Sequence, residues 1–540
     1  MHYHSTPMTG ADAIVAALGR AGVRRLFGMP GGGSTADIME AAAQAGLPFT
    51  LAQTETGSAF MAAAQAEITG APGVCVATLG PGAASLVNGV GHARLDRVPL
   101  AILTDCLPDE IAAFADHQKL PHEAFFGPLT KSSAVARAGN AGTAVADALA
   151  TAVEGQPGPV HVDISPTVTA AAEHAVTDHV APRPPVSLRT QWPPAAQQLM
   201  RAARRPLMLV GLGARTSAVA EALLAVMTSH GVPALVTYKA KGVVPDAHPW
   251  WGGVLTHGAL ERPLLDQADL FIGVGFDPVE LLPRAWTCPQ PVVSLRGWPI
   301  EQRQVRVAEA VVGDLPHLIA DLAAGLESVS EWRQADVAAL AAAQRTAMRP
   351  PGEPGSLLPH EVVDLVAERY AGARVTVDAG AHMFPVMSLW PARVPNGVLI
   401  SNGLATMGFA LPAAIGAALL DAPRPVVAFT GDGGLLMCLG ELKTAAREGV
   451  RIRVIVLDDG ALSLIRIKQL QRGYSTGGTG LGPVDWCAVG AGLGVASFRA
   501  DSAAALRAVL ADTANHPGPV LIAAAVSPAG YPATIRTLRG

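Results

Sequence analysis

The chain has 540 residues, half of them hydrophobic, which implies several packed domains rather than a single core. A formal net charge of −5 gives no basic surface of the kind that nucleic acid requires. No apolar run is long and uninterrupted enough to cross a bilayer. We therefore expect neither a nucleic-acid partner nor a membrane partner.

The cysteines are scattered and form no CxxC pair, and most of them lie in apolar runs. This pattern is typical of reduced, buried thiols and indicates neither a disulfide framework nor a zinc site. The first residues, 1–7, lack a basic segment followed by an apolar stretch, so no signal peptide is indicated. A cytoplasmic protein is the expectation.

Strand-like apolar runs alternate with alanine-rich helical runs along the chain. The clearest strands are expected at 74–79, 100–104, 159–164, 207–211, 270–274 and 426–429. Near-continuous apolar strands with intervening helices are typical of parallel sheets covered on both faces. The sequence thus predicts the α/β fold class, with doubly wound parallel sheets.

Two proline-rich segments, 179–187 and 348–356, break this alternation and have the composition of linkers. They divide the chain into three domains of ordinary size, at about 1–180, 190–345 and 355–540.

In the first domain, Glu55 follows a short apolar strand and directly precedes an alanine-rich helix. An acidic residue there is explained simply by its favourable interaction with the positive end of the helix dipole. In an apolar setting the same group could also share a proton at neutral pH and serve in acid–base chemistry. The residues alone leave both explanations open.

The middle domain opens with a strand followed by Gly211-Leu212-Gly213. A Gly-x-Gly turn in this position could cradle the diphosphate of a flavin or of ADP. Because a two-glycine turn is common in proteins that bind neither, FAD is the less favoured expectation.

The third domain holds the most informative feature, a Gly-Asp-Gly-Gly turn at the end of the strand that begins at Val426. A second strand ends in an Asp-Asp-Gly-Ala turn, and Asp432 and Asp459 lie 459 − 432 = 27 residues apart, with a helix-like segment at 436–447 between the strands. Adjacent parallel strands would bring both turns to one sheet edge. Carboxylates there suit Mg²⁺ and the phosphates of a ligand, and the glycines and the helix N-terminus suit a diphosphate. An ordinary strand-to-helix turn would explain Gly-Asp-Gly on its own.

Two further segments agree with this interpretation. Residues 401–416 read Ser-Asn-Gly-Leu-Ala-Thr-Met-Gly-Phe-Ala-Leu-Pro-Ala-Ala-Ile-Gly, and residues 378–382 read Asp-Ala-Gly-Ala-His. With the two acidic turns and the Glu55 segment, they make the chain resemble the thiamine-diphosphate enzymes of the acetolactate synthase and 2-oxoacid decarboxylase group. The resemblance implies a pyrimidine-binding, a middle and a diphosphate-binding domain, in that order, and thiamine diphosphate and Mg²⁺ as cofactors.

The resemblance also implies roles for residues of the third domain. Mg²⁺ would be bound by the side chains of Asp432 and Asp459 and by the carbonyl of Ala461. Met407 would wedge between the two cofactor rings, and the carbonyl of Ala405 would accept a hydrogen bond from the 4′-amino group. The remaining expected cofactor contacts are Gly380, His382, Gly433, Gly434 and Ile465. Without the family match, core packing would be the simpler explanation of the methionine, and a loop position that of the histidine.

In the first domain, the resemblance implies that Glu55 hydrogen-bonds N1′ of the cofactor and activates it, and that Gln118 lies near the reacting carbons. In relatives the first and third domains that share one cofactor come from different subunits. A homodimer or homotetramer with active sites at the subunit interface is therefore implied by the resemblance.

The chain departs from its best-known relatives at four positions. Asp459 replaces the usual Asn and adds a negative charge near the diphosphate. His117 replaces a Phe; it and His122 are the acid–base candidates of this loop, although an exposed loop His is more often a bystander. Ile465 stands where pyruvate decarboxylases carry a proton-donating Glu, which favours carboligation over aldehyde release. Gly275 stands where an Arg would hold the carboxylate of a second oxoacid.

Three hypotheses follow. The leading one is an enzyme that uses thiamine diphosphate and Mg²⁺ to decarboxylate or ligate a 2-oxoacid, in the manner of acetolactate synthase. The alternative is a lyase that cleaves a 2-hydroxyacyl or 1,2-dione substrate, or a flavin-linked oxidase, on the same scaffold. The third is a binding or regulatory protein without catalysis, and retention of Glu55 beside an intact acidic clamp argues against it.

Overall fold

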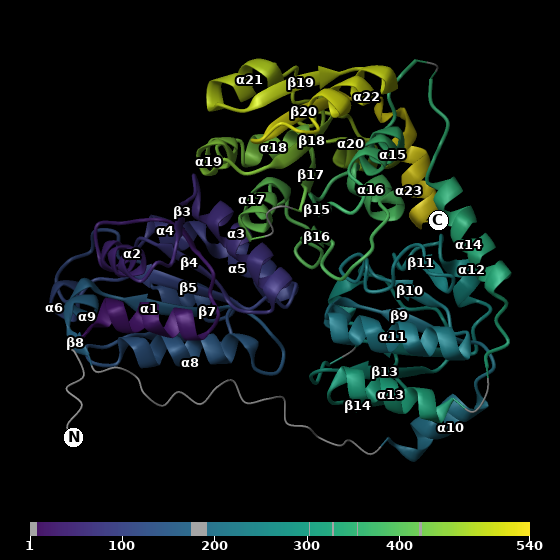
Figure 1. Cartoon of the computed structure of the whole chain (residues 1–540), viewed down its shortest axis with the longest axis horizontal. Helices are drawn as coiled ribbons and strands as arrows, with labels where there is room; N and C mark the ends of the chain where they lie inside the picture. Colours follow the sequence, from purple (N-terminus) through teal and green to yellow (C-terminus); the bar gives the residue numbers. More distant parts are fainter. Residues whose placement is uncertain are drawn as a thin grey trace.

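The computed structural model of the chain describes residues 8–173, 192–301, 303–326, 329–353, 355–420 and 424–539. Three parallel six-stranded sheets, each flanked by helices, form the molecule (Figure 1), which confirms the predicted fold class. The predicted linker at 179–187 lies outside the described residues. The domain boundaries placed there stay a prediction.

The first sheet lies within residues 26–164. Its order is β3 (Phe49–Leu51), β2 (Leu26–Met29), β4 (Gly73–Ala77), β5 (Leu100–Asp105), β7 (Val160–Ile164) and β6 (Ser133–Val135). Its helices are α1 (Gly10–Arg20), α2 (Ser34–Gln44), α3 (Glu55–Thr69), α4 (Pro81–Ser85), α5 (Val87–Leu95), α6 (Asp109–Ala112), α7 (His122–Phe126), α8 (Ala141–Val153) and α9 (Pro166–Ala170). Two short strands, β1 (Met8–Thr9) and β8 (Ala172–Glu173), pair antiparallel beside it.

The middle sheet lies within residues 206–312. Its order is β11 (Trp251–Val254), β10 (Ala234–Val236), β9 (Pro206–Val210), β12 (Leu270–Val274), β13 (Val292–Arg296) and β14 (Glu309–Val312). Its helices are α10 (Pro194–Ala202), α11 (Ser217–His230), α12 (Arg262–Leu265), α13 (Leu315–Gly325) and α14 (Gln334–Ala347).

The third sheet lies within residues 374–525. Its order is β16 (Val398–Ile400), β15 (Arg374–Val377), β17 (Val426–Gly431), β18 (Ile452–Asp458), β20 (Val520–Ala525) and β19 (Ala496–Ala500). Its helices are α15 (Pro359–Arg369), α16 (Met383–Leu389), α17 (Ala410–Leu420), α18 (Asp432–Met437), α19 (Glu441–Glu448), α20 (Ser463–Gln471), α21 (Trp486–Leu493), α22 (Ala503–Asp512) and α23 (Tyr531–Arg539).

The first and third sheets have the same topology. Numbered in chain order within each domain, their strands run 2-1-3-4-6-5, whereas those of the middle sheet run 3-2-1-4-5-6. In open parallel sheets, ligands bind beyond the carboxyl ends of the strands where the order reverses. In the third sheet this point lies between β15 and β17.

The six strands expected from the sequence are all present. The helix expected at 436–447 is wrong, because α18 ends at Met437 and α19 begins only at Glu441. The break has a packing reason: Gly440 lies against Gln53 of the first domain, with 3.1 Å between the Gln53 Cβ and the position that a Cβ at Gly440 would take.

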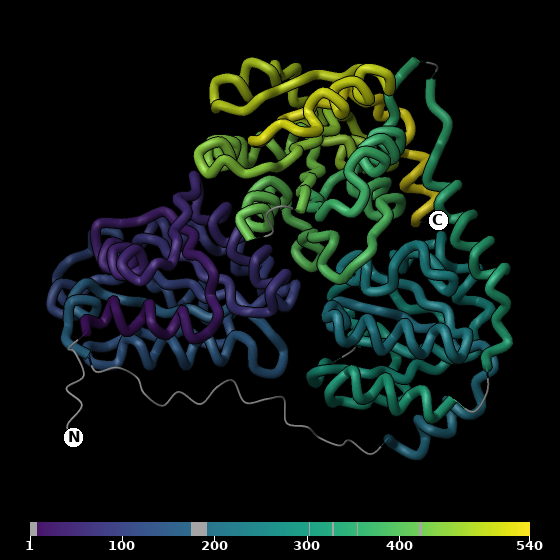
Figure 2. Tube along the Cα trace, viewed as in Figure 1, coloured from purple at the N-terminus to yellow at the C-terminus, as the bar shows by residue number. Residues whose placement is uncertain are grey.

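The first and third domains share one hydrophobic core. It runs from β4 and β5 through the crossing of α3 and α17 to β17 and β18. At the crossing, a Cβ on Gly416 would lie 2.3 Å from the Met61 carbonyl oxygen, so only glycine permits the helices to approach this closely. The C-terminal helix α23 then reaches the middle domain, where the Ala259 N–H donates to the Leu538 carbonyl (Figure 2).

No helix among the described residues combines the length and the apolar character needed to cross a membrane. The five cysteines are unpaired, and Cys75 and Cys438 are buried.

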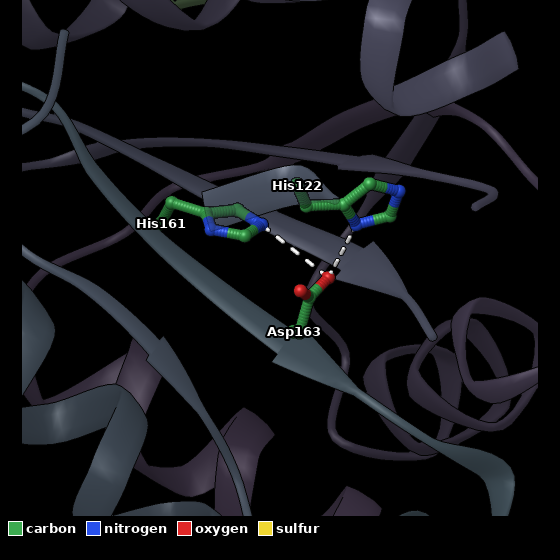
Figure 3. Close-up of side chains that lie close together, drawn as sticks. All are labelled: His122, His161 and Asp163. Atoms are coloured by element: carbon green, nitrogen blue, oxygen red, sulfur yellow. Dashed lines mark hydrogen bonds and ion pairs between the residues drawn. The ribbon is translucent and has the colours of Figure 1, made fainter. Parts of the chain in front are cut away.

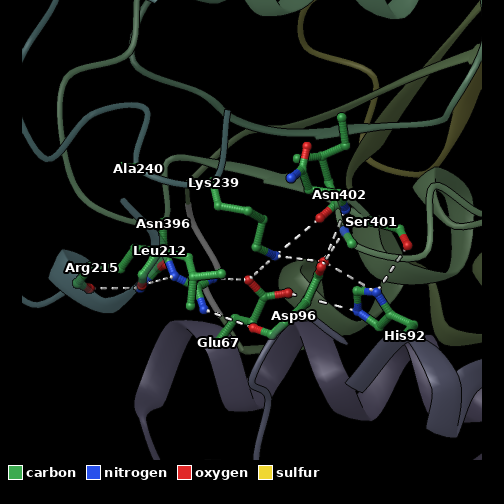
Figure 4. A network of polar contacts seen from close by, with 12 residues as sticks. Glu67, His92, Asp96, Leu212, Arg215, Lys239, Ala240, Asn396, Ser401 and Asn402 are labelled. Carbon is green, nitrogen blue, oxygen red and sulfur yellow. Dashed lines mark hydrogen bonds and ion pairs between the residues drawn. The ribbon is translucent and has the colours of Figure 1, made fainter. Parts of the chain in front are cut away.

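A buried cluster of charges joins all three domains (Figure 4). The Lys239 ammonium of the middle domain donates to Glu67 at 2.6 Å and lies 3.2 Å from Asp96, both of the first domain. Asp96 in turn accepts the backbone N–H groups of Asn402 and Gly403 of the third domain, at 3.0 and 2.6 Å. Because these side chains are almost wholly buried, their charges must balance one another.

The electrostatics agree with this pairing. Burial on its own raises the pKa of the Glu67 carboxyl, but Lys239 and Arg215 together hold that pKa below its usual range. The pKa of Asp96 is likewise lowered, because Lys239, His92 and the two N–H groups outweigh its burial. Both groups therefore stay ionised.

We expect Lys239→Met to destabilise the protein by about 3–5 kcal/mol, because it removes the lysine that pairs with Asp96 and leaves Glu67 with Arg215 alone. Chemical denaturation at neutral pH measures the change. A double variant that also carries Glu67→Gln should recover part of the loss. A Lys239→Met protein as stable as the wild type would mean that the cluster is not a net contributor to stability.

Candidate functional site

A cavity of about 490 Å³ opens at the reversal point of the third sheet. Its lining comes from the carboxyl ends of β15, β17 and β18, from the loop before α17, from α16, α20 and α23, and from segments of the middle domain at 238, 255–256 and 279–283. It includes the expected site residues of the third domain: Gly380, His382, Ala405, Met407, Asp432, Gly433, Gly434, Asp459, Ala461 and Ile465. The structure thus brings these ten residues together.

The two acidic turns lie side by side because β17 pairs parallel with β18, with Gly431 opposite Leu457. One carboxylate oxygen of Asp432 accepts the N–H of Gly433 at 2.8 Å, and the other is buried without a partner among the described residues. Asp459 accepts the N–H of Ala461 at 3.1 Å and the hydroxyl of Ser463 at 2.7 Å. Two carboxylates that face one cavity form a donor set that suits Mg²⁺.

Burial acts on both acids. It raises the pKa of Asp432 above its usual value. It also raises the pKa of Asp459 to about 6, with a further contribution from the nearby Asp432 charge. A cation between these groups would relieve both effects.

The walls of the cavity fit a diphosphate. His382 is buried, its Nε2 has no partner in the described part of the chain, and burial lowers its pKa to about 4. A Cβ at Gly434 would lie 2.4 Å from the Asp378 carboxylate, and one at Gly433 would lie 2.6 Å from Leu462. Any side chain at these two positions would therefore displace its neighbours, and both glycines line the cavity.

Asp378 organises this region, a role that the sequence analysis did not assign. It accepts the N–H groups of Phe409 and Ala410 at 2.7 and 2.8 Å and the hydroxyl of Thr430 at 2.7 Å. It thereby ties the start of α17 to the end of β17. The signal available in the sequence was an acidic residue directly after an apolar strand.

The segment before α17 has an unusual backbone. Ala405 has φ +53° and Gly408 has φ +78°. A left-handed conformation is uncommon for alanine, and such strain is frequent at functional positions. Met407 follows, and its methyl group would lie 3.4 Å from a Cβ on Gly433, so the side chain reaches across to the Gly-Asp-Gly turn.

Glu55 and Gln118 lie apart from this cavity, on either side of one glycine loop of the first domain. A Cβ at Gly82 would lie 3.2 Å from a carboxylate oxygen of Glu55, and one at Gly80 would lie 2.5 Å from the carbonyl oxygen of Gln118. Glu55 is the first residue of α3, as expected, and Gln118 is exposed with φ +57°. Each residue therefore packs on the same glycine-containing segment, and neither lines the cavity of its own chain.

Glu441 of the third domain holds the segment that carries Glu55. Its carboxylate accepts the N–H groups of Gln53 and Thr54, each at 3.1 Å, and the hydroxyl of Thr444 at 2.7 Å. Burial raises the pKa of this carboxyl. The sequence analysis missed this residue, because a contact across 388 positions leaves no local pattern.

The two histidine candidates differ. His117 is exposed. His122 is buried, and both of its ring nitrogens are engaged, with Asp163 at 2.7 Å and with the Gly80 N–H at 3.2 Å. His122 is therefore not an exposed loop residue, and its role as an acid–base group stays a prediction.

The Gly-x-Gly turn of the middle domain is already filled. The N–H of Leu212 donates to Glu280 at 2.9 Å, and the N–H of Gly213 donates to the carbonyl of Gly275 at 2.8 Å. These are the groups that a dinucleotide diphosphate would need. The turn also explains Gly275: φ is +56°, and a Cβ would lie 2.5 Å from the Ala214 nitrogen, so an Arg does not fit there.

Comparison with known proteins agrees with this geometry. Residues 8–124 match the N-terminal TPP binding domain of thiamine pyrophosphate enzymes, residues 194–322 match their central domain, and residues 378–524 match their C-terminal TPP binding domain. The chain belongs to the thiamine pyrophosphate enzymes of the acetolactate synthase type.

Three relatives illustrate the similarity. The acetolactate synthase isozyme 1 large subunit of Escherichia coli (strain K12) is 31% identical, over 95% of this chain and 93% of its own length. The acetolactate synthase large subunit of Parasynechococcus marenigrum (strain WH8102) is 30% identical, over 95% and 87%. The acetolactate synthase of Bacillus subtilis (strain 168) is 28% identical, over 95% and 92%.

We expect the affinity for Mg²⁺ to fall as pH is lowered through about 6, because the Asp459 carboxylate attracts a cation more strongly than its protonated form, which burial favours. Asp459→Asn should flatten this dependence. Isothermal titration with Mg²⁺ and thiamine diphosphate across this range measures it.

The raised pKa of Asp459 also makes the stability of the ligand-free protein depend on pH. A raised acid pKa stabilises the fold at low pH, and this contribution is lost as pH rises through about 6. Asp459→Asn should therefore be more stable than the wild type above that pH, and the difference should vanish in acid. Asp501→Asn, at an exposed position, is the control that should change neither property. Parallel pH profiles for Asp459→Asn and the wild type would contradict both expectations.

Proposed function

We propose that the protein uses thiamine diphosphate and Mg²⁺ to decarboxylate a 2-oxoacid and to join its acyl carbon to a second carbonyl compound. The observation that carries the proposal is the single cavity in which the two carboxylates, the glycine turn and the strained Ala405–Met407 segment meet. The acetolactate synthase relatives support the reaction class.

Thiamine diphosphate supplies, when bound, a nucleophilic carbon that adds to the carbonyl of the oxoacid. The chain's own residues would do the rest. Asp432, Asp459 and the Ala461 carbonyl would hold Mg²⁺, and the glycine turn and His382 would hold the diphosphate. Ile465 lines the same cavity with an apolar side chain, so it offers no proton there and favours ligation over release of an aldehyde.

Glu55 and Gln118 would complete the site from a second copy of the chain. The cavity lining contains neither residue. Exposed apolar side chains lie near both halves along the chain, namely Ile111, Phe114 and Leu120 near Gln118, Ile465 in the cavity lining, and Leu404, Met437 and Leu470 near lining residues in sequence. Clustered exposed apolar groups are typical of interfaces. They support a homodimer, or a tetramer built from it, with the active site at the subunit interface.

A complementation experiment tests the shared site. Glu55→Gln and Asp432→Asn should each fold and be nearly inactive, the first because it slows proton loss from the cofactor and the second because it weakens the cation site. Co-expressed from one cell, the two variants should form mixed dimers with one intact site. About a quarter of wild-type activity should return on random pairing. Each variant measured alone is the control, and no recovery in verified mixed dimers would place both residues in one subunit.

The identity of the second substrate, the acceptor, depends on which cations of the cavity could bind a carboxylate. Gly275 has no room for a side chain, so this position cannot carry the Arg that would bind the carboxylate of a second oxoacid. Lys468 and Arg539 are the cations that line the cavity among the described residues. The absence of room at 275 favours, as a second candidate, ligation to a neutral aldehyde or the reverse cleavage of such a product.

A proton NMR time course with thiamine diphosphate, Mg²⁺ and pyruvate tests the reaction itself, with a second 2-oxoacid or an aldehyde in parallel. We expect a ligated ketol, because the site lacks the proton donor that would release an aldehyde. Acetaldehyde as the main product would contradict ligation. Unchanged pyruvate alongside cleavage of a 1,2-dione or a 2-hydroxyacyl compound would favour the lyase.

A further inference from the structure

Two histidines and an aspartate lie together in the core of the first domain (Figure 3). His122 Nδ1 lies 2.7 Å from an Asp163 carboxylate oxygen, and His161 Nε2 lies 3.4 Å from the same oxygen. All three residues are buried. The cluster lies at the carboxyl ends of β5 and β7, outside the cavity described above, and the proposed reaction has assigned it no role.

The residue types would suit a metal ion, but the hydrogen bonds account for every ring nitrogen. The Thr104 hydroxyl donates to Asp163 at 2.6 Å and lies 2.7 Å from His161 Nε2, and the other nitrogen of that ring lies 2.8 Å from the Ser133 hydroxyl. Burial favours the protonated acid, yet the hydrogen bonds from both histidines hold the pKa of the Asp163 carboxyl well below its usual range. A complete set of partners and an ionised aspartate form a closed network that needs no cation.

The network fixes which nitrogen of His122 carries the proton. Asp163 can only accept from Nδ1, so the proton is there. The remaining nitrogen, Nε2, is a lone-pair acceptor, and it accepts the backbone N–H of Gly80 at 3.2 Å. Asp163 thus orients the ring, and the ring holds one peptide group of the loop between β4 and α4.

That loop separates the two residues to which the proposed function gives catalytic roles. Gly80, with φ +65°, packs directly on the backbone of Gln118, and Gly82 packs on the carboxylate of Glu55. The hydroxyl of Thr56 also donates to the Ser85 carbonyl at 2.5 Å, so the start of α3 and the loop are joined. A displacement of Gly80 would therefore change the positions of both Glu55 and Gln118.

We propose that His122 is a positioning residue, which Asp163 holds in the Nδ1–H form so that its Nε2 fixes Gly80 and the start of α4 between Glu55 and Gln118. The inference rests on the proposed function only in that the contact is expected to affect turnover of the proposed reaction. The contact itself is independent of the reaction.

Two matched variants separate the two hydrogen bonds of His122. In His122→Asn, the amide N–H₂ can take the place of Nδ1 and keep the bond to Asp163, but the acceptor for Gly80 is lost. In His122→Gln, the amide oxygen can take the place of Nε2 and keep the acceptor, but the bond to Asp163 is lost. Each variant loses one hydrogen bond at the same buried position, and His122→Gln should be the less stable of the two, because the bond that it loses is to a charged carboxylate.

Hydrogen–deuterium exchange of peptides that cover residues 78–84 reads the contact directly. Exchange at Gly80 should be faster in His122→Asn than in the wild type, and nearly unchanged in His122→Gln. The ligation kcat should fall about tenfold in His122→Asn and less than about threefold in His122→Gln, which are changes of the size of one hydrogen bond. The dissociation constant for thiamine diphosphate with Mg²⁺ should change less than kcat does in both, since the residues proposed to hold the diphosphate and the cation lie in the third domain.

Unaltered exchange at Gly80 in His122→Asn, or equal loss of turnover in both variants, would overturn the proposal. So would stoichiometric zinc in the purified wild-type protein, measured by elemental analysis. If His122→Asn does not fold, nitrogen-15 shifts of the labelled histidines in the wild type decide, because a proton on Nε2 of His122 excludes the contact. A wild type that ligates no substrate pair would refute the proposed function, while the exchange experiment would still decide the role of His122.

Discussion

The buried pairing of Glu67 and Asp96 with Lys239 and Arg215 is the constraint on which the arrangement of the domains depends. Charges this deep are tolerated only when each meets its counterpart, and the counterparts here come from two domains, while a third supplies peptide groups. The cluster therefore penalises any relative movement of the three domains. It also fixes the segment 401–403, which leads directly into the strained backbone at Ala405 and the side chain of Met407.

The site residues divide between two domains of identical topology. In the third, the reversal point of the sheet carries the acidic turns and the glycine cradle. In the first, the equivalent strands carry the loop that separates Glu55 from Gln118. The third domain provides the carboxylates of Asp432 and Asp459, and the first domain provides the Glu55 carboxylate and the Gln118 amide. The middle sheet, with a different strand order, contributes a wall and the lysine of the charge cluster.

The sequence predicted what is encoded locally. Apolar strands, the paired acidic turns and Glu55 at the start of a helix follow from neighbouring residues, and β17 and β18 do bring Asp432 and Asp459 to one edge. The rest depends on contacts between distant segments. Glu441 contacts Gln53, Gly275 packs against Gly213, and His122 contacts Asp163. Sequence periodicity does not predict such contacts. The break between α18 and α19 also lies at such a contact, since Gly440 packs against Gln53 of the first domain.

The clamp by Glu441 has a consequence for how two active sites in one dimer would communicate. This side chain belongs to the domain that binds the diphosphate, yet it grips the segment of its own chain whose Glu55 would serve the other subunit's cofactor. Occupancy of one site and proton handling at the next would then be linked through a single carboxylate on α19. In a dimer of the kind proposed, the Glu441 contacts with Gln53 and Thr54 would connect the diphosphate-binding domain of one subunit to the Glu55 that serves the other.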